Sequence, residues 1–184
     1  MNTIQLSQQV FVSDPCYTVG TWCQLLLKNV LPGTYHCNVN QDNIYSRNAT
    51  LEITHQDYTR GKASNLPYDF VTDIGVDSGQ AGIFSASSYR NDQYEVPVIP
   101  GDQWTLGNLI QKDEPGEHWY DKMCGYTCNT EEGWAAYDAG IVCSSGFGDG
   151  YYPVYAAKNA DQQVISLIIE FMGEEKPQGD EYQE

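Results

Sequence analysis

Three aspartates stand beside bends in the sequence, and they are the residues best placed to do chemistry. Asp14 lies in Ser-Asp-Pro-Cys-Tyr, Asp77 in Gly-Val-Asp-Ser-Gly-Gln-Ala-Gly, and Asp149 in Gly-Phe-Gly-Asp-Gly. If the fold brings these segments together, their carboxylates could hold a hard divalent cation or position a water molecule. Aspartate is also common at turns, because its side chain accepts hydrogen bonds from nearby backbone amides. The sequence leaves both roles open.

Glycines surround two of these aspartates. Gly79 and Gly82 follow Asp77, and Gly146 and Gly148 precede Asp149, which is more glycine than a two-residue hairpin turn requires. Because glycine has no side chain, these positions would let a ligand or a second backbone segment approach closely, although β-bulges use glycine in the same way. We therefore predict a ligand site at the bends, formed by Asp14, Tyr17, Asp77, Ser78, Gly79, Gln80, Gly146, Phe147, Gly148, Asp149 and Tyr151.

Aromatic residues, which make up 12% of the chain, crowd near these glycine-rich segments. Aromatic walls with a few polar groups are typical of small-molecule pockets, although most such rings belong to the core. Phe147 and Tyr151, which lie among glycines, are expected to stay partly accessible to solvent.

Other catalytic templates are missing from the sequence. There is no Gly-x-Ser-x-Gly elbow, no phosphate-binding loop ending in Gly-Lys-Ser/Thr, and no histidine pair. The six cysteines include only one close pair, Cys124 and Cys128, so no zinc site is expected and the thiols are expected to be free. We therefore expect no metal or other cofactor and favour a binding role over an enzymatic one.

The composition limits the possible partners. Asp and Glu number 25 against 9 Lys and Arg, which gives a formal net charge of −16. Such a surface repels phosphate backbones and anionic membranes, so direct nucleic-acid binding is not expected. The same charge could instead imitate nucleic acid and occupy a basic protein. No segment has the features of a signal peptide or a membrane span, so a cytoplasmic location is expected.

Strand-like segments dominate the elements that must position these residues. Alternating or continuous apolar residues predict strands near 9–12, 34–39, 49–54, 70–76, 83–84, 140–143, 152–157 and 164–172. A capping-box pattern at Thr21 and Gln24 predicts a helix that ends at Pro32-Gly33, and a second helix is predicted over 117–124. The sequence therefore indicates a mainly β (α+β) protein, either an antiparallel sandwich or a strongly twisted sheet with two short helices. One domain is expected over 1–172, followed by a flexible acidic tail over 173–184.

Three patches resemble a known family. They are Asp14-Pro15-Cys16-Tyr17, the segment 75–82, and the segment 144–155, which contains Gly-Asp-Gly-x-Tyr-Pro-Val-Tyr. The chain resembles, in patches from Val12 to Phe171, small phage and bacterial proteins related to the family called domain of unknown function 4241. The resemblance implies a compact β-rich domain and a phage or bacterial cytoplasmic setting, and it supplies no activity.

The combined expectation is a non-catalytic binding protein of phage or bacterial origin. Its contact face would be built at the three bends, and its partner would be a small molecule or a host protein. Two alternatives remain open. One is a metal-assisted hydrolase that uses Asp14, Asp77 and Asp149 with a divalent cation, and the other is an acidic inhibitor that mimics nucleic acid.

Overall fold

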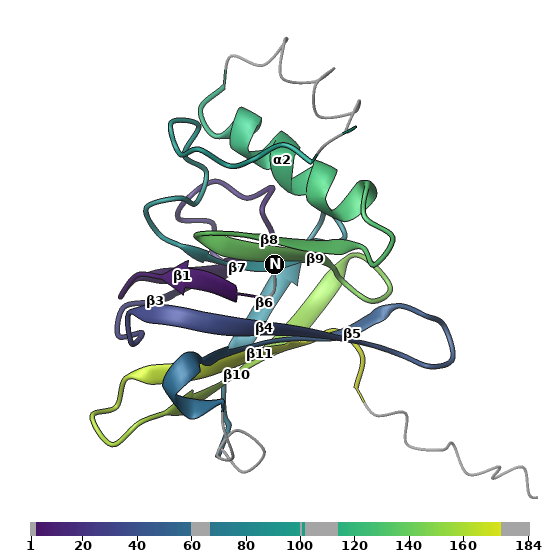
Figure 1. The fold of residues 1–184 in the computed structure, drawn as a ribbon. Helices are drawn as coiled ribbons and strands as arrows, with labels where there is room; N and C mark the ends of the chain where they lie inside the picture. Colours follow the sequence, from purple (N-terminus) through teal and green to yellow (C-terminus); the bar gives the residue numbers. More distant parts are fainter. Residues whose placement is uncertain (1–2, 60–66, 100, 102–113, 174–184) are drawn as a thin grey trace, which may run out of the picture.

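Two antiparallel sheets and an α-helix form three layers in the computed structural model, which describes residues 3–59, 67–99, 101 and 114–173 (Figure 1). Sheet A contains, in spatial order, β1 (Thr3–Leu6), β4 (Gly33–Gln41), β5 (Asn48–His55), β11 (Val164–Glu170), β10 (Gly150–Lys158) and β6 (Asp69–Val76). Sheet B contains β3 (Leu25–Leu27), β2 (Val10–Ser13), β7 (Gln80–Ser85), β9 (Gly140–Ser144) and β8 (Trp134–Tyr137). Helix α2 (Glu117–Cys128) lies over sheet B, and a short 3-10 helix, η1 (Gln56–Tyr58), follows β5.

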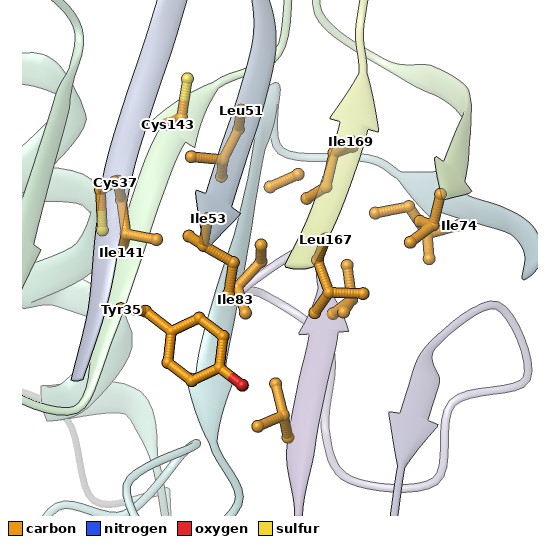
Figure 2. Packing of buried hydrophobic residues seen from close by; sticks show 14 of the residues in the cluster. Tyr35, Cys37, Leu51, Ile53, Ile74, Ile83, Ile141, Cys143, Leu167 and Ile169 are labelled. Atoms are coloured by element: carbon orange, nitrogen blue, oxygen red, sulfur yellow. The ribbon is translucent and has the colours of Figure 1, made fainter. Parts of the chain in front are cut away.

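The main core lies between the two sheets. Alternate side chains of β5 and β11 point inward and meet side chains of β7 and β9, as Figure 2 shows for Leu51, Leu167, Ile83 and Ile141. All four are completely buried. Successive side chains of a strand point to opposite faces, so this alternation buries one face of sheet A and leaves the other in solvent.

A second core covers the opposite face of sheet B. The rings of Phe84 and Trp119 meet edge to face with their centroids 5.1 Å apart, and Met123 and Tyr137 complete the contact between α2 and the sheet. Because sheet B is covered on both faces, every residue of β2 and β7 is buried. This explains why β2 reads as a short continuous apolar run instead of an alternating one.

Helix α2 begins without a capping side chain of its own. Its N-cap residue is Gly116, and the Asp92 carboxylate accepts hydrogen bonds from the backbone N–H groups of Gly116 (2.6 Å) and Trp119 (2.8 Å). A carboxylate at this position satisfies donors that the helix leaves unpaired and interacts favourably with the helix dipole.

The substitution Asp92→Ala is therefore expected to lower the free energy of unfolding by about 1–2 kcal/mol. Urea unfolding of the full chain measures the change. Asp161→Ala, which removes an exposed carboxylate from the turn between β10 and β11, is the matched control. If the two variants lose the same stability, the contribution of the Asp92 cap is refuted.

The predicted mainly β, antiparallel architecture is confirmed. Two sheets enclose the main core, which matches the sandwich alternative in part, and α2 adds a third layer that was not predicted. The helix predicted over 117–124 is confirmed, and it continues through Gly125 to Cys128. Strands β1 and β8 were not predicted from the sequence. Of the expected tail over 173–184, residues 174–184 lie outside the described part of the chain.

The helix predicted from Thr21 is wrong. The capping interaction does form, because Oε1 of Gln24 accepts a hydrogen bond from the Thr21 N–H (3.1 Å). The chain then leaves the turn at once, since Leu25–Leu27 pairs with β2 as the edge strand of sheet B. Pairing with an existing strand here overrides a local helix signal.

The sequence also predicts that no segment spans a membrane and that the cysteine thiols are free. In the ranges that the structure describes, no helix has the length and apolarity needed to cross a membrane. All six cysteines lie in these ranges and none forms a disulfide, which confirms the expected free thiols.

Candidate functional site

The three bends, numbered along the chain, contain Asp14, Asp77 and Asp149. The Asp14 carboxylate joins the first bend to the second. Its Oδ2 accepts hydrogen bonds from the backbone N–H groups of Asp77 (2.8 Å) and Ser78 (2.7 Å). Its Oδ1 accepts from the N–H of Cys16 (2.8 Å) and from the Ser78 hydroxyl (2.6 Å). Asp14 is completely buried, so these four bonds replace the water that a carboxylate would otherwise bind. The segment after β2 is thereby fixed to the turn between β6 and β7.

The third bend packs against the second. The Ser145 N–H donates to the carbonyl oxygen of Gly79 (2.9 Å), and the Gly148 N–H donates to the carbonyl of Ser145 (2.6 Å). Gly79 and Gly148 have φ angles of +68° and +107°, a region that side chains disfavour, and a Cβ at Gly79 would lie 3.8 Å from the Cα of Gly148. Three bends that are distant in sequence therefore meet at one place.

The three aspartates differ in their surroundings. Asp14 is buried and hydrogen-bonded, whereas Asp77 and Asp149 are exposed. Across the described ranges, no group of three His, Cys, Asp or Glu side chains is placed to hold a metal ion. Asp14 thus has the turn role: it positions the neighbouring bend and would have to break four hydrogen bonds to bind a cation.

A cavity of about 430 Å³ opens beside the joined bends. We call it the acidic aromatic recess, and it is lined by Tyr17, Thr21, Trp22, Cys23, Gly75, Val76, Asp77, Asp149, Gly150 and Tyr151. The ring centroids of Trp22 and Tyr151 are 6.2 Å apart, and the ring planes meet at an angle of 43°. Trp22 is 81% exposed and Tyr151 is 64% exposed. The recess thus presents two accessible rings and two carboxylates.

Gly75 makes this arrangement possible. It lies directly across from Tyr151 in the pairing of β6 with β10, and its N–H donates to the carbonyl of Cys23 (3.1 Å). A Cβ at Gly75 would lie 2.9 Å from the Cys23 Sγ and 3.6 Å from Cε1 of Tyr151. The missing side chain lets the 21–23 segment dock on β6, which brings Trp22 beside Tyr151.

Tyr17 lines the recess as a neutral phenol. Burial raises the pKa of the Tyr17 hydroxyl above its usual value, and the neighbouring Asp77 and Cys23 side chains raise it further. The hydroxyl therefore keeps its proton at neutral pH and is available as a donor to a carboxylate. Its backbone is held as well, because the Tyr89 hydroxyl donates to the Tyr17 carbonyl (2.7 Å).

A second, polar recess of about 280 Å³ lies on the other side of the joined bends. Its lining includes Arg47, Asn48 and Glu131 together with Gly79, Gly146 and Gly148. Arg47 donates to the Gly146 carbonyl (3.0 Å), and its guanidinium lies 5.0 Å from the centre of the Phe147 ring. This side of the bends is thus held together by a cation–π contact and a hydrogen bond.

The predicted site residues divide among these places. Tyr17, Asp77, Asp149 and Tyr151 line the acidic aromatic recess, while Gly79, Gly146 and Gly148 line the polar recess. Phe147 is 60% exposed beside Arg47, so the expected accessibility of Phe147 and Tyr151 is confirmed. Ser78 and Asp14 line neither recess, and the Ser78 hydroxyl donates to the Asp14 carboxylate. Gln80 is buried, and its amide donates to the Cys124 thiol (3.4 Å), so it lines neither recess.

Trp22, Cys23 and Gly75 line the acidic aromatic recess but were missing from the predicted site. Trp22 lies in the segment for which the sequence predicts a helix, and that helix does not form. A sequence signal for Gly75 does exist, since a glycine inside a strand often marks a close approach of another backbone.

Comparisons with known proteins give one finding. Searches of the curated proteins and of the solved structures return no match to this chain. A family model does match residues 5–169, which include the helix, all three bends and all but the outer ends of β1 and β11. The chain therefore belongs to the family described as Protein of unknown function (DUF4241).

Proposed function

We propose that this chain is a non-catalytic binding protein and that the acidic aromatic recess is its ligand site. The observation that carries the proposal is the pair of exposed rings, Trp22 and Tyr151, held over a cavity. Large aromatic side chains usually lose their exposure on folding, and those that stay exposed beside a concave surface are typical of binding sites. The docking of the 21–23 segment on Gly75 fixes the backbone that carries Trp22 beside the strand that pairs with Tyr151.

The chemistry near the bends supports binding over covalent catalysis. Burial and the neighbouring Asp14 carboxylate raise the pKa of the Cys16 thiol well above its usual value. A thiol that keeps its proton is a poor nucleophile. The accessible groups of the recess are mainly rings and carboxylates, which hold a ligand by contact and charge, and the Cys23 thiol in its lining is buried.

The family resemblance suggests the setting for this activity. In a phage or bacterial cytoplasm, the protein would sequester a small molecule or occupy a host protein through the recess. A volume of about 430 Å³ is within the range of small-molecule pockets, so we favour a small ligand.

Ligand-observed NMR with a mixture of small cationic, neutral and anionic fragments tests the proposal. We expect some fragments to bind the full chain and to bind Trp22→Ala at least about ten-fold more weakly, since an aromatic anchor often carries most of the contact energy. Folding should be unaffected, because Trp22 is 81% exposed. Phe70→Ala is the matched control, as Phe70 is an exposed ring on β6 outside the lining. If no fragment distinguishes Trp22→Ala from this control, the recess is not a binding site.

A further inference from the structure

We propose that the acidic aromatic recess is selective for an organic cation, a quaternary or protonated alkylammonium group. The inference rests on the proposed function and names the ligand class of the same site. It follows from the charges of the lining, the geometry of the rings, and the way the carboxylates are held.

The charge of the recess has one sign. Asp77 and Asp149 are exposed, and no residue in the described lining is basic. An anionic ligand would be repelled by both carboxylates and by the formal net charge of −16. A neutral ligand would cover carboxylates without offering them a partner, which costs desolvation. A cation avoids both problems.

The rings select the type of cation. Trp22 and Tyr151 stand 6.2 Å apart at an angle of 43°, so they form an open wedge. A cation binds a ring favourably within about 6 Å of the ring centre, and a group seated in the wedge is in reach of both rings. Aromatic faces suit alkylated ammonium groups, whose methyl groups also gain from apolar contact. Small metal ions prefer a shell of oxygen ligands, which the two aromatic faces of the wedge do not supply.

The backbone that carries the Asp77 carboxylate is held in advance of binding. Its N–H donates to the buried Asp14 carboxylate, and the neighbouring N–H of Ser78 donates to the same oxygen. Asp149 belongs to the third bend, which is held to the second by the bond between Ser145 and Gly79. The two charges therefore come from bends that are fixed by buried contacts, so little ordering is needed when a cation binds.

A set of three ligands of the same shape tests the inference on the full chain. Choline is cationic, 3,3-dimethylbutan-1-ol is its neutral counterpart, and 3,3-dimethylbutanoate is anionic. By calorimetry and ligand-observed NMR, we expect choline to bind at least about ten-fold more tightly than the alcohol, with no binding of the anion. Nα-acetyl-lysine amide serves as a further arm. Choline binding tighter than this ligand indicates a free quaternary ammonium, and the reverse order indicates a lysine side chain of a protein.

The double variant Asp77→Asn, Asp149→Asn removes both charges and keeps the side-chain shapes. It should reduce choline affinity to that of the alcohol and leave the alcohol unchanged. The fold is expected to survive, because both side chains are exposed and Asp14 binds the backbone of residue 77. Equal affinity for choline and the alcohol, or no choline binding while other fragments bind in a Trp22-dependent way, would overturn the cation selectivity and leave the binding function standing. If no ligand depends on Trp22, the proposed function itself fails.

Discussion

Replacing Asp14 with alanine is expected to destabilise the protein by about 4 kcal/mol or more. The carboxylate accepts hydrogen bonds from the backbone N–H groups of Cys16, Asp77 and Ser78 and from the Ser78 hydroxyl. Each bond to a charged acceptor contributes about 1.5–3 kcal/mol, and each buried donor left without a partner costs about 1–3 kcal/mol. Water entering the space left by the side chain would recover part of the loss.

Urea unfolding followed by circular dichroism measures this effect, with Asp161→Ala as the control for an exposed carboxylate. Asp14→Asn should lose nearly as much stability, because its amide nitrogen replaces one acceptor with a donor that faces other donors. A loss below about 1 kcal/mol for Asp14→Ala would show that the bends hold together without the carboxylate. In that case the account of how the site is positioned would have to be abandoned.

The effect should reach the recess. Asp77 is placed by its backbone bond to Asp14, and the second bend in turn supports the third through Gly79 and Ser145. Loss of the first link is expected to loosen the turn that carries Asp77 and Ser78. Variants at Asp14 that still fold are therefore expected to bind ligands more weakly, although Asp14 does not line the recess.

The sequence predicted where the strands lie along the chain better than it predicted which strands pair with each other. Alternation at Leu51 and Ile53 identifies β5, because a strand with one buried face has no other way to arrange its apolar residues. The same alternation does not say that β5 pairs with β11, which begins more than a hundred residues later. Strand β1 has only two apolar residues, Ile4 and Leu6, which are too few to establish an alternation, whereas β2 has three in a row.

For the candidate site too, the sequence predicted the local turns but not the contacts between them. The bends at Asp14, Asp77 and Asp149 were identified from their aspartates and glycines, since such residues adopt turn geometry locally. That Asp14 would bind the backbone of Asp77, 63 residues away, depends on how sheet B pairs β2 with β7. The role of Trp22 was hidden for a different reason. Its neighbours carry a true capping interaction, but the chain that follows pairs with β2 as strand β3.

Glycine within sheet B has a separate function from glycine at the bends. Gly82 and Gly140 lie on neighbouring strands under the Phe84 ring, and a Cβ at Gly140 would come within 2.8 Å of it. A Cβ at Gly82 would overlap both the Phe84 ring and the carbonyl oxygen of Ile141. The two glycines leave the space in which Phe84 reaches Trp119 of α2.

Gly82→Ala is therefore expected to lower the free energy of unfolding by about 3 kcal/mol, as overpacking a filled core forces side chains and backbone to move. Thermal and urea unfolding measure the loss, and near-ultraviolet circular dichroism should report a changed environment of the Phe84 and Trp119 rings. Gly173→Ala is the matched control, because its Cβ would meet nothing within 4 Å, and it should change stability by less than about 0.5 kcal/mol.

A double variant, Gly82→Ala with Phe84→Leu, separates the two overlaps at Gly82. Removing the ring relieves the first, while the overlap with the Ile141 carbonyl belongs to the pairing of β7 with β9 and persists. The leucine should therefore restore only part of the stability that the alanine removes, relative to Phe84→Leu alone. Full restoration would show that the ring alone requires glycine at this position. Stability equal to wild type in Gly82→Ala itself would contradict the close packing of sheet B that carries α2 on one face and the main core on the other.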